Sequence, residues 1–247
     1  MLYKKDVNRF LKYFHLELNG LGYMQSLRKY ATPPDPLKFQ VENIHNAKII
    51  FDVGANRGDT VQKYYELFPN SHIYAFEPFP ELFKLLTERF NSFSSIHCLP
   101  FAISNKESLV PFYTNFNPDT NSLLKPKKIG LNSDKQAANL GSIDIKTTSL
   151  DLYCEANNIS EICILKLDIQ GGELEALKGA IKLLTTKSIK LIYTETYFRG
   201  QYEDQPLFHD ICKFLFQFGY FLQDIYNPIY GNGSIVWCDA IFVPIDK

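Results

Sequence analysis

Four short apolar runs in this chain are each followed directly by an acidic residue. Short, nearly continuous apolar segments are typical of parallel strands that are buried on both faces of a sheet. Helix-like segments separate the runs, so the strands are expected to point the same way and to end at one edge. Ligands of open α/β sheets bind at that edge, and the gathered carboxylates predict a site for a cationic ligand that bears hydroxyl groups. The runs and their acids are 49–51 with Asp52, 73–76 with Glu77, 164–167 with Asp168, and 191–194 with Glu195.

The alternation of strand and helix patterns predicts an α/β fold. We expect a sheet of about seven strands, mostly parallel, with helices on both faces because crossovers are right-handed. Two closing segments, 220–226 and 236–243, are near each other in sequence and predict a C-terminal antiparallel hairpin. The earlier strands are expected at 47–53, 72–77, 96–103, 143–149, 162–168 and 189–195, with an extra extended segment at 109–113. The helices are expected at 58–68, from about residue 80 to Phe90, at 150–157, as one helix through Leu174, Leu177, Ile181 and Leu184, and at 207–218.

The N-terminal part of the chain predicts a separate helical extension. Apolar residues recur at steps of four and three within 1–30, which gives a helix with one apolar stripe. Packing of this helix on the main domain is favoured over a role as a dimer seam, and homo-oligomerisation is left open. The proline-rich segment 32–36 ends the helix. We therefore expect a helical N-terminal extension, 1–45, and a main domain, 46–247.

The composition excludes several classes of protein. A formal net charge of −1 leaves no electrostatic footprint for a nucleic acid or an anionic membrane, and no apolar run reaches the ~18 residues of a membrane span. The 5 cysteines are odd in number and form no Cys-x-x-Cys, and no His-x-x-x-His pair occurs, so neither a disulfide framework nor a metal site is expected. Reduced thiols and the lack of an apolar signal-peptide core predict a cytoplasmic location.

A glycine-containing turn follows the first strand and predicts a cofactor site. The small residues of Gly54-Ala55-Asn56-Arg57-Gly58 let a ligand approach the backbone, and the next helix presents free N–H groups there. The acid after the second strand can accept two hydrogen bonds from a ribose diol. Together the two features predict an adenosine-containing cofactor. The alternative is a tight strand–helix turn with a helix cap and no ligand.

The missing motifs narrow the choice of cofactor. The spacing of the turn is Gly-x-x-x-Gly, not the Gly-x-Gly-x-x-Gly of dinucleotide folds. The chain contains neither a Tyr-x-x-x-Lys pair nor a Gly-x-x-x-x-Gly-Lys-[Ser/Thr] phosphate loop. S-adenosylmethionine carries an ammonium and a sulfonium group, and Asp52 and its neighbours favour both charges. The acidic edge therefore fits S-adenosylmethionine better than a diphosphate cofactor.

The motifs at 52–60, 76–78, 165–173 and 177–180 resemble those of FkbM-type S-adenosylmethionine-dependent methyltransferases, and the resemblance covers roughly 47–243. The resemblance implies a class I methyltransferase fold, which is Rossmann-like, and O-methylation of sugars, glycans or polyketide-type natural products. Position 170 is Gln, where the family motif more often has Glu.

The resemblance also implies roles for individual residues of the site. The expected contacts to the methionine end of the cofactor are Asp52, Gly54, Ala55, Asn56 and Gly58. Glu77 is expected to bind the ribose, Pro78 beside it is expected to contact the cofactor, and the segment from Ala102 to Ser104 is expected near the adenine.

Three acids are candidates for catalysis. Methyl transfer is an in-line displacement, so holding the acceptor oxygen in line supplies most of the acceleration, and a nearby carboxylate can take the acceptor proton. Asp168 and Glu173 are the first candidates, and Glu195 at the same edge is the third. Structural alternatives exist, because Glu173 also suits a helix N-terminus and Asp168 also suits a helix cap. Lys166 is expected to be structural or paired with an acid.

These observations predict a cytoplasmic S-adenosylmethionine-dependent O-methyltransferase that acts on a sugar-containing or secondary-metabolite acceptor. The polar segment 114–141 is expected to be a functional lid or disordered. We expect it to shape the acceptor pocket together with 196–206 and the N-terminal helix, with Tyr197 and Arg199 as contacts. Two alternatives remain: a non-catalytic relative that binds the cofactor or a glycan, and a nicotinamide-dependent oxidoreductase.

Overall fold

The structure is a computed structural model that describes residues 35–127 and 139–245. The helix expected within 1–30 lies outside the described residues. A compact unit begins at Pro36, and its first helix, α3 (Pro36–Asn43), packs on the rest of the unit. The fully buried Gln40 accepts a hydrogen bond from the Tyr64 hydroxyl at 3.0 Å. The boundary between an extension and a main domain at residues 45 and 46 stays a prediction.

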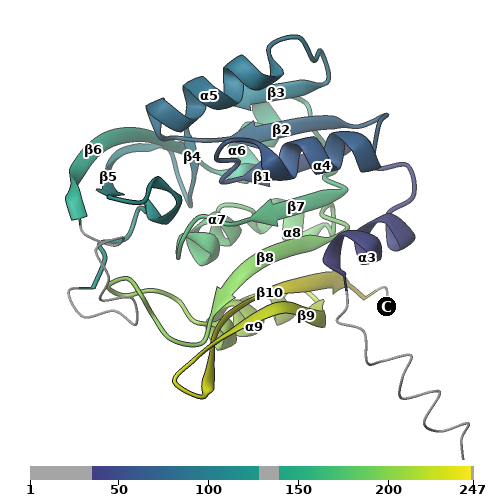
Figure 1. The fold of residues 1–247 in the computed structure, drawn as a ribbon. Helices are drawn as coiled ribbons and strands as arrows, with labels where there is room; N and C mark the ends of the chain where they lie inside the picture. Colours follow the sequence, from purple (N-terminus) through teal and green to yellow (C-terminus); the bar gives the residue numbers. More distant parts are fainter. Residues whose placement is uncertain (1–34, 128–138, 246–247) are drawn as a thin grey trace, which may run out of the picture. The chain divides into compact units, whose positions relative to one another are not determined.

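A seven-stranded sheet forms the centre of this unit, in the order β3-β2-β1-β7-β8-β10-β9 (Figure 1). The first five strands of that order are parallel, while β10 pairs antiparallel with both β8 and β9. The predicted mostly parallel sheet and its C-terminal hairpin are therefore confirmed. The strands are β1 (Ile49–Val53), β2 (His72–Phe76), β3 (Ile96–Leu99), β7 (Ile164–Leu167), β8 (Ile192–Tyr197), β9 (Tyr220–Gly231) and β10 (Ser234–Pro244).

Helices cover both faces of the sheet because successive side chains of a strand point to opposite faces. In β1, Phe51 and Val53 join the core that contains Leu177, whereas Ile50 joins the core that contains Tyr64. The first core includes α6 (Leu150–Ala156), α7 (Glu173–Lys178), α8 (Ile181–Thr185) and α9 (Phe208–Phe216). The second core includes α3, α4 (Asp59–Leu67) and α5 (Pro80–Phe90).

A second, three-stranded sheet in the order β4-β6-β5 lies beside the first and is the main departure from the predicted topology. The segment expected as one strand over 96–103 is divided at Pro100, which has no N–H for the ladder. The segments expected at 109–113 and 143–149 pair with each other here, so neither is part of the main sheet. The elements are β4 (Ala102–Ile103), β5 (Ser108–Asn115), β6 (Asn139–Thr148) and the short 3-10 helix η1 (Pro118–Thr120).

The single helix predicted through Leu174 and Leu184 is wrong, because the chain forms α7 and α8 with a break at Gly179. Gly179 packs so closely that a Cβ there would lie 2.2 Å from the carbonyl oxygen of Ser104. The Asp151 carboxylate then accepts hydrogen bonds from the first N–H groups of α8, at 2.8 and 3.1 Å. The helix direction changes at this point, and Ile181 is 43% exposed instead of buried.

Candidate active site

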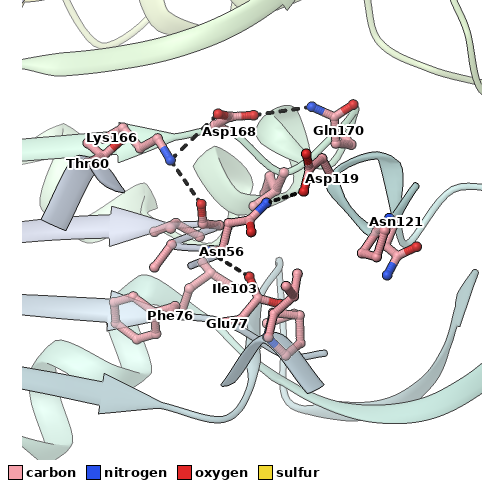
Figure 2. A pocket seen from close by; sticks show the side chains of 18 of the residues that line it. Asn56, Thr60, Phe76, Glu77, Ile103, Asp119, Asn121, Lys166, Asp168 and Gln170 are labelled. Atoms are coloured by element: carbon pink, nitrogen blue, oxygen red, sulfur yellow. Dashed lines mark hydrogen bonds and ion pairs between the residues drawn. The ribbon is translucent and has the colours of Figure 1, made fainter. Parts of the chain in front are cut away.

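A cavity of about 330 Å³ lies at the carboxyl ends of β1, β2 and β7, between the main sheet and the second sheet. Figure 2 shows Asp168 and Gln170 on one side of this cavity and Phe76, Glu77 and Ile103 on the other. Of the predicted site residues, those that line the cavity are Gly54, Ala55, Asn56, Glu77, Pro78, Ala102, Asp168 and Glu195. The structure places Asp52, Gly58 and Glu173 outside the lining.

The glycine turn after β1 adopts a conformation that requires glycine. Gly54 has φ +82°, and a Cβ there would lie 1.9 Å from the backbone oxygen of Asp168. Gly58 has φ +86° and lies against the Phe90 ring, where a Cβ would come within 2.3 Å. Gly54 therefore brings β7 close to the floor of the cavity, whereas Gly58 seats α4 against α5 and does not contact the cavity.

The Glu77 carboxylate is fixed at the end of β2 by two backbone groups. One oxygen accepts from the N–H of Asn56 and the other from the N–H of Phe79, each at 2.9 Å. The side chain is buried, and burial raises the pKa of Glu77 to about 7 although the two backbone hydrogen bonds lower it. Each carboxylate oxygen can accept further hydrogen bonds, so Glu77 can receive the two hydroxyls of a ribose.

The same side of the cavity has an apolar wall that suits a flat aromatic ring. Pro78 and Ala102 were predicted here. Phe112 of β5 and Leu82 of α5 were not, and no motif points to them. The apolar residues of this wall are Phe76, Pro78, Leu82, Ala102, Ile103 and Phe112. An adenine ring would fit these surroundings beside Glu77.

An ion triad of Asp52, Lys166 and Asp168 forms the floor of the cavity. The Lys166 ammonium is 2.8 Å from Asp52 Oδ1, 3.6 Å from Asp168 Oδ2 and 2.9 Å from the carbonyl oxygen of Gly54. Asp52 is 0% exposed and burial raises its pKa against the opposing effect of Lys166, while the neighbouring carboxylates raise the pKa of Lys166 against burial. One ammonium faces two carboxylates, so the ionised triad keeps a negative charge that suits a cation above it.

Glu195 belongs to a hydrogen-bonded group at the other end of the cavity. Its Oε2 accepts from the Tyr197 hydroxyl at 2.5 Å and from Gln170 Nε2 at 2.8 Å. Burial, followed by the charges of Asp168 and Glu173, raises the pKa of Glu195 well above its usual value. Tyr197 is buried as part of this group, whereas Arg199 hydrogen-bonds to Ser234 and does not line the cavity.

Glu173 holds the turn after β7 instead of facing the cavity. Its Oε1 accepts from the N–H of Ile169 at 3.0 Å and from the N–H of Gly171 at 3.2 Å. The side chain is buried, and burial raises the pKa of Glu173 to about 7. The contacts of Glu173 are thus those of a turn-holding residue, and its predicted catalytic role stays a prediction.

The segment 115–123 forms a further wall of the cavity, here called the upper wall. It lies within 114–141, the region predicted to shape the pocket. Asp119 Oδ1 accepts from Asn56 Nδ2 at 3.0 Å (Figure 2), and it also pairs with Arg57 at 2.8 Å. Asn121 lines the cavity, and its Oδ1 accepts from the N–H of Asn115 at 2.7 Å. Its buried Nδ2 has no hydrogen-bond partner among the described residues, which leaves a donor for a ligand.

The sheet order, the acid after β2 and the negatively charged cavity floor together define a class I S-adenosylmethionine-dependent methyltransferase. The chain belongs to the FkbM methyltransferase domain family, whose model matches residues 52–222. The predicted family, fold class, enzyme class and cofactor are therefore confirmed, and the nicotinamide-dependent alternative is set aside.

Two curated relatives share this family resemblance. The 2-O-methyltransferase NoeI of Sinorhizobium fredii is 24% identical over 217 residues, covering 82% of this chain and 84% of the relative. The hexuronic acid methyltransferase AglP of Haloferax volcanii is 26% identical over 172 residues, covering 69% of this chain and 65% of the relative. Among solved structures, an rRNA methylase from Streptococcus thermophilus aligns over 87% of this chain and 100% of its own, with a TM-score of 0.49 and 12% identity.

Neither a membrane-spanning helix nor a cluster of metal ligands occurs within residues 35–127 and 139–245. None of the helices in these ranges combines the length and the apolar character needed to cross a bilayer. Within the same ranges, no three His, Cys, Asp or Glu side chains are grouped so that they could hold a metal ion.

Proposed function

We propose that this methyltransferase acts on a hydroxyl oxygen of a sugar-containing or secondary-metabolite acceptor in the cytoplasm. The observation that carries the proposal is the pair of carboxylates, Asp168 and Glu195, at the end of the cavity away from the apolar wall. The names of the two relatives, a 2-O-methyltransferase and a hexuronic acid methyltransferase, support the same class of acceptor. The 5 free cysteines support a reducing compartment.

Residues of this chain fit the cofactor at three points. Glu77 would hold the ribose, the apolar wall with Phe112 and Ile103 would hold the adenine, and the backbone of Gly54 to Asn56 would lie along the methionine end. The negative charge of the triad beneath favours the positive charges of that end. The unpartnered Nδ2 of Asn121 supplies one more donor.

When bound, S-adenosylmethionine supplies an electrophilic methyl group on a sulfonium centre. The Asp168 side chain is 45% exposed and lines the cavity, so it can reach an acceptor hydroxyl and take its proton. Because Asp168 is partly exposed, it can then pass the proton to solvent. Glu195 lies beside it as the second acid at this end.

The experiment combines an acceptor panel with a variant of Asp168. Methyl-labelled S-adenosylmethionine is supplied with free sugars, hexuronic acids, oligosaccharides and polyketide-type metabolites, and labelled product is counted. We expect Asp168→Ala to lower kcat on the methylated acceptor by about 10²–10⁴-fold, as for loss of a proton-transfer group. Cofactor affinity, measured by calorimetry, should fall far less than kcat, because Glu77 and the apolar wall are untouched although the triad loses one of its two carboxylates.

Asp144→Ala is the matched control, because Asp144 is an exposed residue of β6 away from the cavity. It should retain wild-type turnover. An undiminished kcat in Asp168→Ala would remove Asp168 from the mechanism, and labelling of no hydroxyl acceptor in the panel would contradict the proposed acceptor class.

A further inference from the structure

Gln170 occupies a backbone conformation that side-chain-bearing residues rarely adopt. It lies in the turn between β7 and α7 with φ +55°, in the left-handed region. Its carbonyl oxygen accepts a hydrogen bond from the Ser122 hydroxyl at 2.7 Å, which ties the turn to the upper wall. Conformations of this kind persist only where surrounding contacts fix them, and they are concentrated at functional sites.

All polar positions of the Gln170 amide are used by partners within the protein. Its Nε2 lies 3.2 Å from Asp168 Oδ1 and 2.8 Å from Glu195 Oε2 (Figure 2 shows the first contact). Its Oε1 lies 3.1 Å from the hydroxyls of both Tyr197 and Tyr202. An amide has two N–H donors and one acceptor oxygen, so the opposite orientation would place its oxygen against two carboxylates. The orientation of the amide is therefore fixed by its neighbours.

Two carboxylates that share one site normally retain a proton, because their charges repel each other. In this site an N–H group of Gln170 is directed at each carboxylate, and these donors favour the charged forms against the burial and the neighbouring charges that raise the pKa of Glu195. Tyr197 also donates to Glu195, and the hydroxyl of Tyr202 lies 2.9 Å from the carbonyl oxygen of Thr120. The charged groups that act on the pair from neighbouring elements are Lys166, Glu173 and Asp239.

We propose that Gln170 is a positioning residue for methyl transfer, whose amide holds Asp168 and Glu195 together at the acceptor end of the cavity and favours release of the proton that the two acids would otherwise retain. Gln170 lines the cavity but acts through the two acids, because its own polar atoms are already bonded. The inference rests on the proposed function, which assigns proton transfer to this end. A carboxylate at position 170 would lack both N–H groups and would add a third negative charge to the pair.

The test is infrared difference spectroscopy of the folded full-length protein near neutral pH, without cofactor or acceptor. In Gln170→Met the two donors are lost while the length of the side chain is kept. In the difference spectrum against wild type, we expect a positive carbonyl band of a protonated carboxyl group for Gln170→Met and no such band for Gln170→Met/Glu195→Gln. Gln62→Met is the control, since the Gln62 amide donates to Glu66 at 2.7 Å at an exposed position, and it should show no new band.

Tyr197→Phe provides a second route to the same result if Gln170→Met does not fold, because it removes the other donor to Glu195. The absence of the band in whichever of these variants folds would overturn the proposal. On an acceptor found by the panel, the acid limb of the kcat profile in Gln170→Met should move upward by about one pH unit or more. A uniform loss of kcat at every pH would also overturn it. A panel without any acceptor would count against the proposed function alone, since the infrared band needs no acceptor.

Discussion

Replacement of Lys166 by methionine tests the ion triad at the floor of the cavity. The variant leaves the Asp52 carboxylate, which is 0% exposed and 2.8 Å from the ammonium, buried without its cation. Removal of one partner from a buried pair lowers the free energy of unfolding by about 3–5 kcal/mol. For a chain of this size each kcal/mol lowers Tm by about 2–4 °C, so we expect a fall of about 6–20 °C.

The assay is denaturant unfolding of wild type, Lys166→Met, Asp52→Asn and Lys166→Met/Asp52→Asn at two pH values. The double variant should be more stable than Lys166→Met, because it contains no unpaired buried charge. The pKa of Asp52 should rise further in Lys166→Met, since burial already raises it and the opposing cation is gone. The loss of stability should therefore be largest at high pH and shrink as falling pH protonates Asp52.

Lys84→Met is the matched control for this cycle. The Lys84 and Glu88 side chains are 77% and 60% exposed and their charged atoms are 3.9 Å apart, so the change should stay within about 0.5 kcal/mol. The reasoning is refuted if Lys166→Met loses less than about 1 kcal/mol, or if adding Asp52→Asn restores nothing.

Two further predictions concern the cofactor side of the cavity. Because burial raises the pKa of Glu77 to about 7 and a cationic cofactor favours the ionised carboxylate, calorimetric affinity for S-adenosylmethionine should increase as pH rises through that value. Glu77→Gln should abolish this increase, and an unchanged pH dependence would contradict the assignment. Gly54→Ala should lose soluble protein or cofactor binding, because its Cβ would meet the Asp168 backbone oxygen at 1.9 Å with φ +82°. Gly233→Ala, at φ +75° in open space, isolates that clash and should remain functional.

The strand ends that form the site can be predicted from the sequence, because each is marked by a short run of neighbouring residues. Apolar runs that end in Glu77 and Asp168 identify buried parallel strands, and such strands bring their ends to one edge. The family motifs added the cofactor and the class of reaction. The side chains of both acids line the cavity as expected.

The direction of each acidic side chain was not accessible in the same way. Asp52 lies opposite Lys166 in the register of β1 and β7, and this pairing directs its carboxylate into a buried ion pair instead of the cavity. Glu173 folds back on the turn to accept two backbone N–H groups. Strand register sets the direction of the Asp52 side chain, and turn geometry sets that of Glu173. Neither property can be read from the sequence of a single strand and the residues after it.

Three residues of the cavity lining are not predicted individually. Phe112 lies in β5, Asp119 in η1 and Asn121 directly after η1, far in sequence from the motifs. Asp119 and Asn121 fall in the segment 114–141, which is predicted to shape the pocket because a long polar segment in a compact domain is often functional, whereas Phe112 falls in the segment expected only as an extended strand. Such a prediction identifies the segment, but tertiary packing determines which of its residues line the cavity.

The turn at 118–122 forms hydrogen bonds to residues at both the cofactor end and the acceptor end of the cavity. Asp119 bonds to Asn56 and Arg57, beside the proposed site of the methyl donor. Ser122 and Thr120 bond to Gln170 and Tyr202, beside the acids proposed to accept the proton. A movement of this turn would therefore open both ends of the cavity at the same time. We therefore expect the demethylated cofactor and the methylated product to leave by the same route. We also expect the binding of either substrate to stabilise the turn for the binding of the other.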